Sequence, residues 1–246
     1  IWWNYPVSDF VRDRLLLGPT YGNDLDIASL LSGFVSNPMQ YAEASKISLY
    51  SVADYTWNMQ AYDADASWER ALREVLPSAA SALRTFATYN EDLGPNGHGF
   101  RRDESREIAD ICTRAAEGDA DAVRALDAQS SLLAAAADRL LQDKENPLLI
   151  DEMRPWLIQA KVVADYGRTV CAMHTAAKDK WPAANFEDLY QQARYLKRRM
   201  YENENDASQL HAYQTGTKLA TLRYLPAVDR LFARLVEAYN LQHDTH

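Results

Sequence analysis

The second half of the chain limits the possible folds most, because its apolar residues recur at helical spacing almost without a break beyond residue 100. Gly118 and the pair Asn146-Pro147 are typical of a helix end and a helix start within this half. The segments expected to be helical are Asp103–Glu117, Ala120–Lys144, Pro147–Lys180, Phe186–Glu204 and Lys218–Leu241. This series predicts an antiparallel bundle of about five helices, with residues 101–246 as its domain.

The first ninety residues follow a different pattern, in which two short strands alternate with helices. Ile1–Val7 and Leu30–Ser36 are rich in aromatic and β-branched residues, which is typical of strands. Helices are expected over Phe10–Leu17, after Asn37-Pro38, from about Ser67, and from Pro77 to about Tyr89. Because two strands rarely make a stable sheet, we expect strand partners from another segment.

A Gly- and Pro-rich stretch, Asn90–Gly99, is the clearest break in the chain. We therefore place a domain boundary there, with residues 1–95 as the N-terminal unit. The fold class expected for the whole chain is mainly α.

Composition excludes several classes of protein. The 246 residues are 47% hydrophobic and 25% charged, which is typical of a globular protein and not of a disordered one. The formal net charge of −9 argues against a nucleic-acid partner, and no apolar run is long enough for a membrane span. The histidines and the two cysteines, Cys112 and Cys171, lack metal-ligand spacing, so no metal and no cofactor is expected. Whether the cysteines form a disulfide stays open.

Three motifs in the N-terminal region are long enough to compare with known families. They are Trp2-Trp3-Asn4-Tyr5-Pro6-Val7-Ser8-Asp9, Gly18-Pro19-Thr20-Tyr21-Gly22 and Gly33-Phe34-Val35-Ser36-Asn37-Pro38-Met39. With the runs Glu43–Ile47 and Ala53–Asn58, they resemble glycoside hydrolase family 84, the O-GlcNAcase-like β-N-acetylglucosaminidases, some of them named hyaluronidases. The match is close over residues 1–70, and beyond residue 100 only the order of parts agrees.

The resemblance implies that the chain holds the last strand–helix units of a (β/α)8 barrel, followed by the helical bundle. It implies a retaining hydrolase of terminal β-linked GlcNAc on glycans or proteins, in which the 2-acetamido group of the substrate acts as the nucleophile. The family's paired aspartates lie upstream of the segment that matches Ile1. We therefore expect no catalytic residue in this chain, no activity from the chain alone, and an N-terminal companion segment that completes the barrel.

Kinship further implies an extracellular or periplasmic location. The chain itself shows no targeting signal, since Trp2-Trp3-Asn4-Tyr5 is not a charged region that leads into an apolar run.

Four residues match sugar-binding positions of the family: Trp2, Asn4, Asp9 and Asn37. The resemblance implies that Trp2 walls the acetamido pocket, that Asn4 binds near the scissile oxygen, and that Asp9 and Asn37 bind sugar hydroxyls. Trp2 and Asn4 share one face of the predicted strand, whereas Trp3 lies on the other and is expected to pack in the core. The residues alone leave other roles open, because Asp9 and Asn37 both precede predicted helices and could cap them.

Two rival functions remain. The chain could be a non-catalytic helical interaction module or a domain fragment, in which case no companion holding the aspartate pair would accompany it. It could instead belong to a hyaluronan-cleaving enzyme, which needs a basic groove for a polyanion. Before residue 70 the chain offers only Arg12, Arg14 and Lys46 for such a groove, so exo-hydrolysis is preferred.

Overall fold

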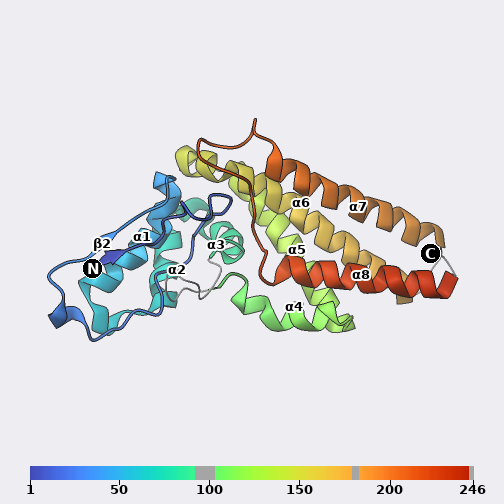
Figure 1. Ribbon diagram of the computed structural model, residues 1–246, viewed down its shortest axis with the longest axis horizontal. Coiled ribbons are helices and arrows are strands. Elements are labelled where there is room, and N and C mark those ends of the chain that lie inside the picture. Colours follow the sequence, from blue (N-terminus) through green and yellow to red (C-terminus); the bar gives the residue numbers. More distant parts are fainter. Residues whose placement is uncertain (92–102, 179–182, 244–246) are drawn as a thin grey trace.

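The computed structural model describes residues 1–91, 103–178 and 183–243, and it is mainly α as expected. Figure 1 shows an elongated molecule with the strand pair near one end and the bundle helices extending toward the other. The strands are β1 (Trp2–Trp3) and β2 (Val35–Ser36). The helices are α1 (Ala42–Trp57), α2 (Ala64–Val75), α3 (Ala80–Thr88), α4 (Ala109–Ala116), α5 (Ala120–Leu141), α6 (Pro147–Lys178), α7 (Ala183–Asn205) and α8 (Tyr224–His243).

The two strands are shorter than predicted and pair in parallel, with Trp2 opposite Val35 and Trp3 opposite Ser36. The prediction of a helix over Phe10–Leu17 is wrong. Residues 8–14 form turns, in which Val11 N–H donates to the Ser8 carbonyl, and Leu15–Leu17 continue as a buried run. Leu17 N–H donates to the Asn90 carbonyl at 2.7 Å, so a partner far away in the sequence replaces the helical hydrogen bond.

The helix expected directly after Asn37-Pro38 begins later, at Ala42. Tyr41 stands at its N-cap position and makes no side-chain cap. Asn37 therefore does not cap this helix. By contrast, aspartates cap α2 and α5: Asp63 accepts from Ala66 N–H, and Asp119 accepts from the N–H groups of Asp121 and Ala122. Helix α2 therefore begins at Ala64, before the expected start near Ser67.

The predicted bundle of five helices is confirmed by α4–α8, in which α5, α6, α7 and α8 alternate in direction (Figure 1). Asn146 caps α6 as expected, because its Oδ1 accepts from Leu149 N–H at 3.1 Å. Gly167 of α6 leaves room for the buried Tyr224 hydroxyl, which lies 2.6 Å from Ser130 Oγ of α5. This contact joins three helices at the centre of the bundle.

The connection between α7 and α8, residues 206–223, runs back over the N-terminal region (Figure 1). Thr215 N–H donates to the Arg12 carbonyl, and Lys218 N–H donates to the Asp13 carbonyl at 2.7 Å. Leu222 N–H donates to the carboxylate of Glu104 at 2.6 Å. Burial of Glu104 raises its pKa to about 7.

The predicted domain boundary falls on residues 92–102, outside the residues that the structure describes. The division into 1–95 and 101–246 stays a prediction, and buried residues from both parts belong to one continuous hydrophobic core. Within the three described ranges, no helix is both long and apolar enough to cross a membrane. Cys112 and Cys171 are buried free thiols, and burial raises the pKa of each to about 12.

Candidate functional site

Three of the four predicted sugar-binding residues meet where the two parallel strands end. Asn4 follows β1 and Asn37 follows β2, and the strand register places them side by side. Asn4 Oδ1 accepts from Trp2 Nε1 at 2.7 Å and from Asn37 Nδ2 at 3.4 Å. The carboxyl ends of parallel strands are where α/β enzymes place their ligand-binding groups. We call Trp2, Asn4 and Asn37 the strand-end cluster.

The strand-end cluster is open to solvent. Trp2 is 68% exposed, Asn4 is exposed and Asn37 is half-buried. A hydrogen bond fixes the indole of Trp2 in spite of its exposure, so its apolar face is presented in a defined orientation. The cluster can therefore offer a ring face and amide groups to a polar ligand.

Asp9 makes no hydrogen bond to this cluster among the described residues. It stands on the exposed turn after β1 and lines a shallow depression of about 320 Å³ together with the residues that follow it and Thr215. Its place in a sugar site therefore remains a prediction.

The opposite side of β1 faces the protein interior, as predicted for Trp3. The half-buried Trp3 packs against the core, and its Nε1 donates to Thr20 Oγ1 at 3.0 Å. Tyr5 is buried, and its hydroxyl donates to the Gly18 carbonyl at 2.6 Å. The alternation of side chains along the strand thus separates a solvent-facing pair, Trp2 and Asn4, from a core-facing pair.

A carboxylate that sequence reasoning did not assign caps the helix next to the cluster. Glu152 of α6 accepts from Glu43 N–H at 3.2 Å and from Ala44 N–H at 2.9 Å, at the start of α1. Burial raises the pKa of Tyr41 to about 12, and the Glu152 carboxylate adds to this effect. The only sequence signal for such a cap is that Tyr41 has no side chain able to supply one.

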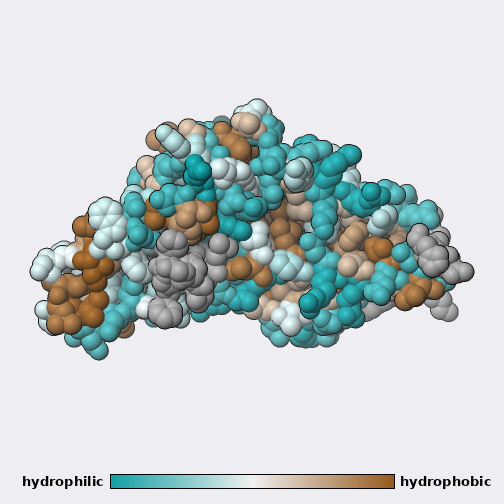
Figure 2. Space-filling model, viewed as in Figure 1, coloured by the Kyte–Doolittle hydropathy of each residue, from teal (hydrophilic) through white to brown (hydrophobic). Residues whose placement is uncertain are grey.

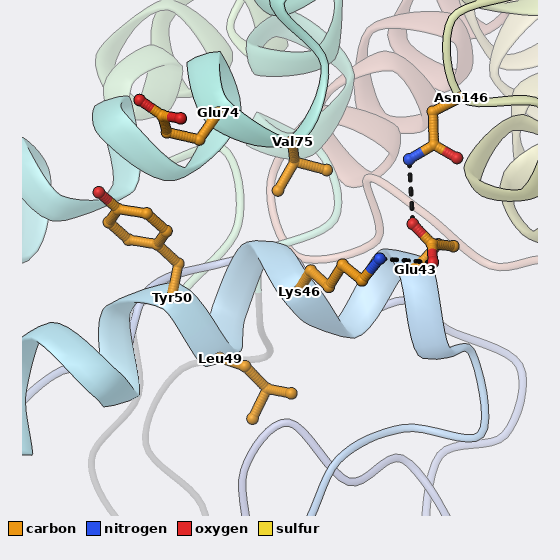
Figure 3. A pocket seen from close by; sticks show the side chains of 7 residues that line it. All are labelled: Glu43, Lys46, Leu49, Tyr50, Glu74, Val75 and Asn146. Carbon is orange, nitrogen blue, oxygen red and sulfur yellow. Dashed lines mark hydrogen bonds and ion pairs between the residues drawn. The ribbon is translucent and has the colours of Figure 1, made fainter.

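A separate pocket of about 450 Å³ lies between α1, α2 and the start of α6 (Figure 3). One of its two carboxylates, Glu43, already accepts from Lys46 Nζ at 2.5 Å and from Asn146 Nδ2 at 3.0 Å. These two hydrogen bonds lower the pKa of Glu43. With its central ion pair satisfied within the protein, the pocket joins α1 to the bundle and offers less to a ligand than the strand-end cluster does.

Apolar side chains lie exposed around the strand pair, at the end of the molecule that is brown in Figure 2. They include Ile1 (50% exposed), Leu30 (79%) and Val35 (53%). Each strand also has an edge that the other strand does not cover, since the sheet described here has two strands. Exposed strand edges and apolar patches of this kind are typical of surfaces that bind another segment.

Among the described residues, no group of three or more His, Cys, Asp or Glu side chains could hold a metal ion. Asp151 and Glu152 lie on α6, where Glu152 serves as the helix cap and the exposed Asp151 carboxylate pairs with Arg154. Another adjacent pair of carboxylates, Glu91-Asp92, is described only in part, because Asp92 lies outside the described residues.

Comparisons with known proteins agree with this arrangement. A family model described as β-N-acetylglucosaminidase matches residues 1–88, and one described as the post-catalytic domain of bacterial GH84 matches residues 110–232. The chain belongs to glycoside hydrolase family 84. In this family 84 chain, the strand-end cluster lies in the region that matches the β-N-acetylglucosaminidase model, and Glu152 lies in the region that matches the post-catalytic domain.

Solved structures of family 84 members have the same fold. CpGH84B is 24% identical with a TM-score of 0.81 over 94% of this chain, and CpGH84D is 25% identical with a TM-score of 0.81 over 96%. An O-GlcNAc hydrolase mutant of Thermobaculum terrenum is 21% identical with a TM-score of 0.74 over 99%. The chain spans only 39%, 40% and 50% of those solved chains, respectively.

Proposed function

We propose that this chain is the C-terminal part of a retaining β-N-acetylglucosaminidase that hydrolyses terminal β-linked GlcNAc from glycans or from proteins. In this proposal Trp2, Asn4, Asp9 and Asn37 bind the sugar. The paired aspartates that move protons belong to a companion segment upstream, which completes a (β/α)8 barrel. The chain alone is then inactive.

The observation that carries the proposal is the strand-end cluster. Asn4 Oδ1 holds both Trp2 and Asn37 at the carboxyl ends of two parallel strands, within the region that matches the β-N-acetylglucosaminidase model. The competing structural roles are also missing, because residues 10–17 form no helix for Asp9 to cap and α1 begins five residues after Asn37. These polar side chains therefore stay available for a ligand.

The chemistry expected of the complete site is substrate-assisted. The acetamido carbonyl oxygen bonds to the anomeric carbon while the glycosidic C–O bond breaks, and one aspartate protonates the leaving oxygen. This first step gives an oxazoline intermediate. Water then opens the oxazoline by attacking the anomeric carbon, so the product retains its configuration. The exposed ring face of Trp2 suits the N-acetyl methyl group, and amide groups such as that of Asn37 suit hydroxyls, which both donate and accept hydrogen bonds.

The need for a companion follows from the surface around the strands. A two-stranded sheet is marginal by itself, and exposed Leu30 and Val35 beside it favour coverage by neighbouring barrel segments. The coverage of 39–50% of the solved chains supports the same reading.

The test is hydrolysis of an aryl N-acetyl-β-D-glucosaminide, with the chain content of the sample read by intact mass. We expect turnover only when the companion segment is present, and turnover by the isolated chain would contradict the assignment of the aspartates. Absence of turnover with the companion present would favour the helical interaction module instead. Cleavage of hyaluronan in preference to the aryl glycoside would favour a hyaluronan-cleaving enzyme. Arg14 and Lys46 argue against this function, because both already pair with carboxylates.

Binding by Asn37 has its own expected signature in the active enzyme. Asn37→Ala removes a contact made equally in ground state and transition state, so KM should rise about tenfold while kcat changes less than twofold. Asn58→Ala is the matched control, since Asn58 follows the last residue of α1 and its side chain caps the short turn Met59–Ala61. An equal KM for both variants would contradict a role of Asn37 in binding the sugar.

A further inference from the structure

One face of α6 reaches both chain segments that leave the strand pair. Glu152 and Trp156 are four residues apart in α6, so their side chains lie on the same side of the helix, one turn apart. The first segment follows β1 and contains Asp9 and Asp13, and the second follows β2 and contains Asn37 and Tyr41. The bundle thereby contacts the backbone that carries the proposed sugar-binding residues.

Glu152 holds the end of the second segment. The first N–H groups of a helix lack partners within the helix, and Tyr41 makes no side-chain cap for them. The Glu152 carboxylate accepts from Glu43 N–H and Ala44 N–H, and its charge is favourable at the positive end of α1. The four residues 38–41 that separate Asn37 from α1 therefore end at a point fixed by the bundle.

Trp156 holds both segments at once. The side chain is fully buried, and its Nε1 donates to the Asp13 carbonyl at 3.0 Å. Its ring meets the ring of Tyr41 edge to face, with centroids 5.4 Å apart and planes at 79°. A single indole thus joins the loop after β1 to the loop after β2.

His211, from the connection between α7 and α8, adds a third contact. Pro155 has no N–H, so the Asp151 carbonyl, four residues earlier in α6, lacks its usual helical partner. His211 Nε2 lies 3.0 Å from that carbonyl, and because a carbonyl only accepts, the ring nitrogen donates. The His211 ring also packs edge to face against Tyr41, with centroids 5.9 Å apart. Tyr41 is therefore held by rings from two parts of the bundle.

We propose that Glu152 and Trp156 are positioning residues of the sugar-binding site, through which the post-catalytic bundle fixes Asn37 and the loop that carries Asp9. This inference rests on the proposed function for its enzymatic consequence. On this account the bundle is a structural part of the active site, and loosening it changes substrate binding without any contact between bundle and sugar.

The first experiment needs no activity. Amide hydrogen exchange of residues 37–44, measured on the 246-residue chain, should become at least fivefold faster in Glu152→Ala. Glu152→Gln, which keeps one accepting oxygen, should give an intermediate rate. Asp151→Ala is the matched control, because this neighbouring carboxylate is exposed and pairs only with Arg154 among the side chains that the structure describes. Unchanged exchange in Glu152→Ala would overturn the proposal.

The second experiment measures KM and kcat for an aryl N-acetyl-β-D-glucosaminide in the complete enzyme. We expect KM to rise about tenfold in Glu152→Ala, less in Glu152→Gln, and not at all in Asp151→Ala, with kcat within twofold throughout. Trp156→Phe keeps an aromatic ring for Tyr41 but removes the donor to Asp13, so it should raise KM without the unfolding that Trp156→Ala risks.

The outcomes separate the two proposals. Faster exchange with an unchanged KM would show that Glu152 orders the loop before α1 but does not affect substrate binding. This result would overturn the positioning role. Absence of turnover by the unmutated complete enzyme would overturn the proposed function, whereas the exchange rates would still decide whether α6 holds the loop. Loss of kcat with KM unchanged would also contradict positioning of binding residues.

Discussion

The bundle and the N-terminal region differ in how far each encloses its own groups. In the bundle, long polar side chains that are buried find partners on neighbouring helices: Gln159 Nε2 donates to the Met200 carbonyl, and Asn203 Nδ2 donates to Gln159 Oε1. Around the strand pair, Trp2, Leu30 and Val35 are more than half exposed. A helix satisfies its backbone internally, whereas a strand depends on neighbours that a two-stranded sheet cannot fully supply.

The strand region leaves strand edges and apolar side chains exposed, which is what we expect if the proposed companion segment covers them. The difference between the two regions also explains why the bundle extends its contacts toward the strand region. With few strand hydrogen bonds of its own, that region takes backbone partners from α6 and from residues 206–223 instead. The order of the proposed sugar site then depends on a domain that lies after it in the sequence.

The largest effect should come from a methyl group added inside the bundle. In Gly167→Ala the new Cβ would collide with the Tyr224 hydroxyl and lie 2.8 Å from Ser130 Oγ. Overpacking and loss of the buried Tyr224–Ser130 contact should together cost about 4 kcal/mol in the free energy of unfolding. Denaturant titration followed by circular dichroism measures this loss.

The matched control adds the same methyl group near the strands. Gly33→Ala places its Cβ where no atom lies within 4 Å, so the stability should change by less than about 0.5 kcal/mol. Similar losses for the two variants would mean that the packing of the two regions does not differ as described.

A second test probes the junction between the regions, where Glu104 accepts from Leu222 N–H. Burial raises its pKa to about 7, above the ordinary glutamate value of 4.5. The folded chain therefore holds the proton more tightly than the unfolded chain, and this stabilisation is full below pH 4.5 and lost as the pH rises toward 7. The loss should amount to about 3 kcal/mol, and Glu104→Gln should remove it.

The measurement is the free energy of unfolding at several pH values between 4.5 and 8, compared between the unmutated chain and Glu104→Gln. Glu74→Gln is the control, because Glu74 lines an open pocket on the surface. If the difference between the unmutated chain and Glu104→Gln did not vary with pH, the buried carboxyl would not titrate as described.

The sequence predicted the bundle better than the strand region, for a physical reason. Helix α6 depends on local signals, namely Asn146 as its cap and apolar residues that recur at helical spacing along it. The run Phe10–Leu17 satisfied the same local rules, yet its backbone pairs with Asn90, some seventy residues away. Local patterns cannot reveal a partner at that distance.

The site shows the same division. Alternation along β1 was enough to place Trp2 and Asn4 on one face, and the strand register brings Asn37 to them. Glu152 and His211 could not be found this way, since their roles arise from defects elsewhere: a helix start without a cap and a proline that leaves a carbonyl unpaired. Such defects are visible in a sequence, but the residue that repairs them is not.

The smallest effect on stability should come from the exposed apolar side chains, and it tests the comparison most directly. Leu30 is 79% exposed beside the strands and Leu241 is 80% exposed on α8. Leu30→Lys and Leu241→Lys should each change the stability of this chain by less than about 0.5 kcal/mol, because neither side chain is buried. Only Leu30→Lys should weaken association with the companion segment, by about tenfold or more in Kd, since a charge would then be buried at the contact. Equal Kd values for the two variants, measured by titration calorimetry, would show that the apolar surface around the strands is not where the companion binds.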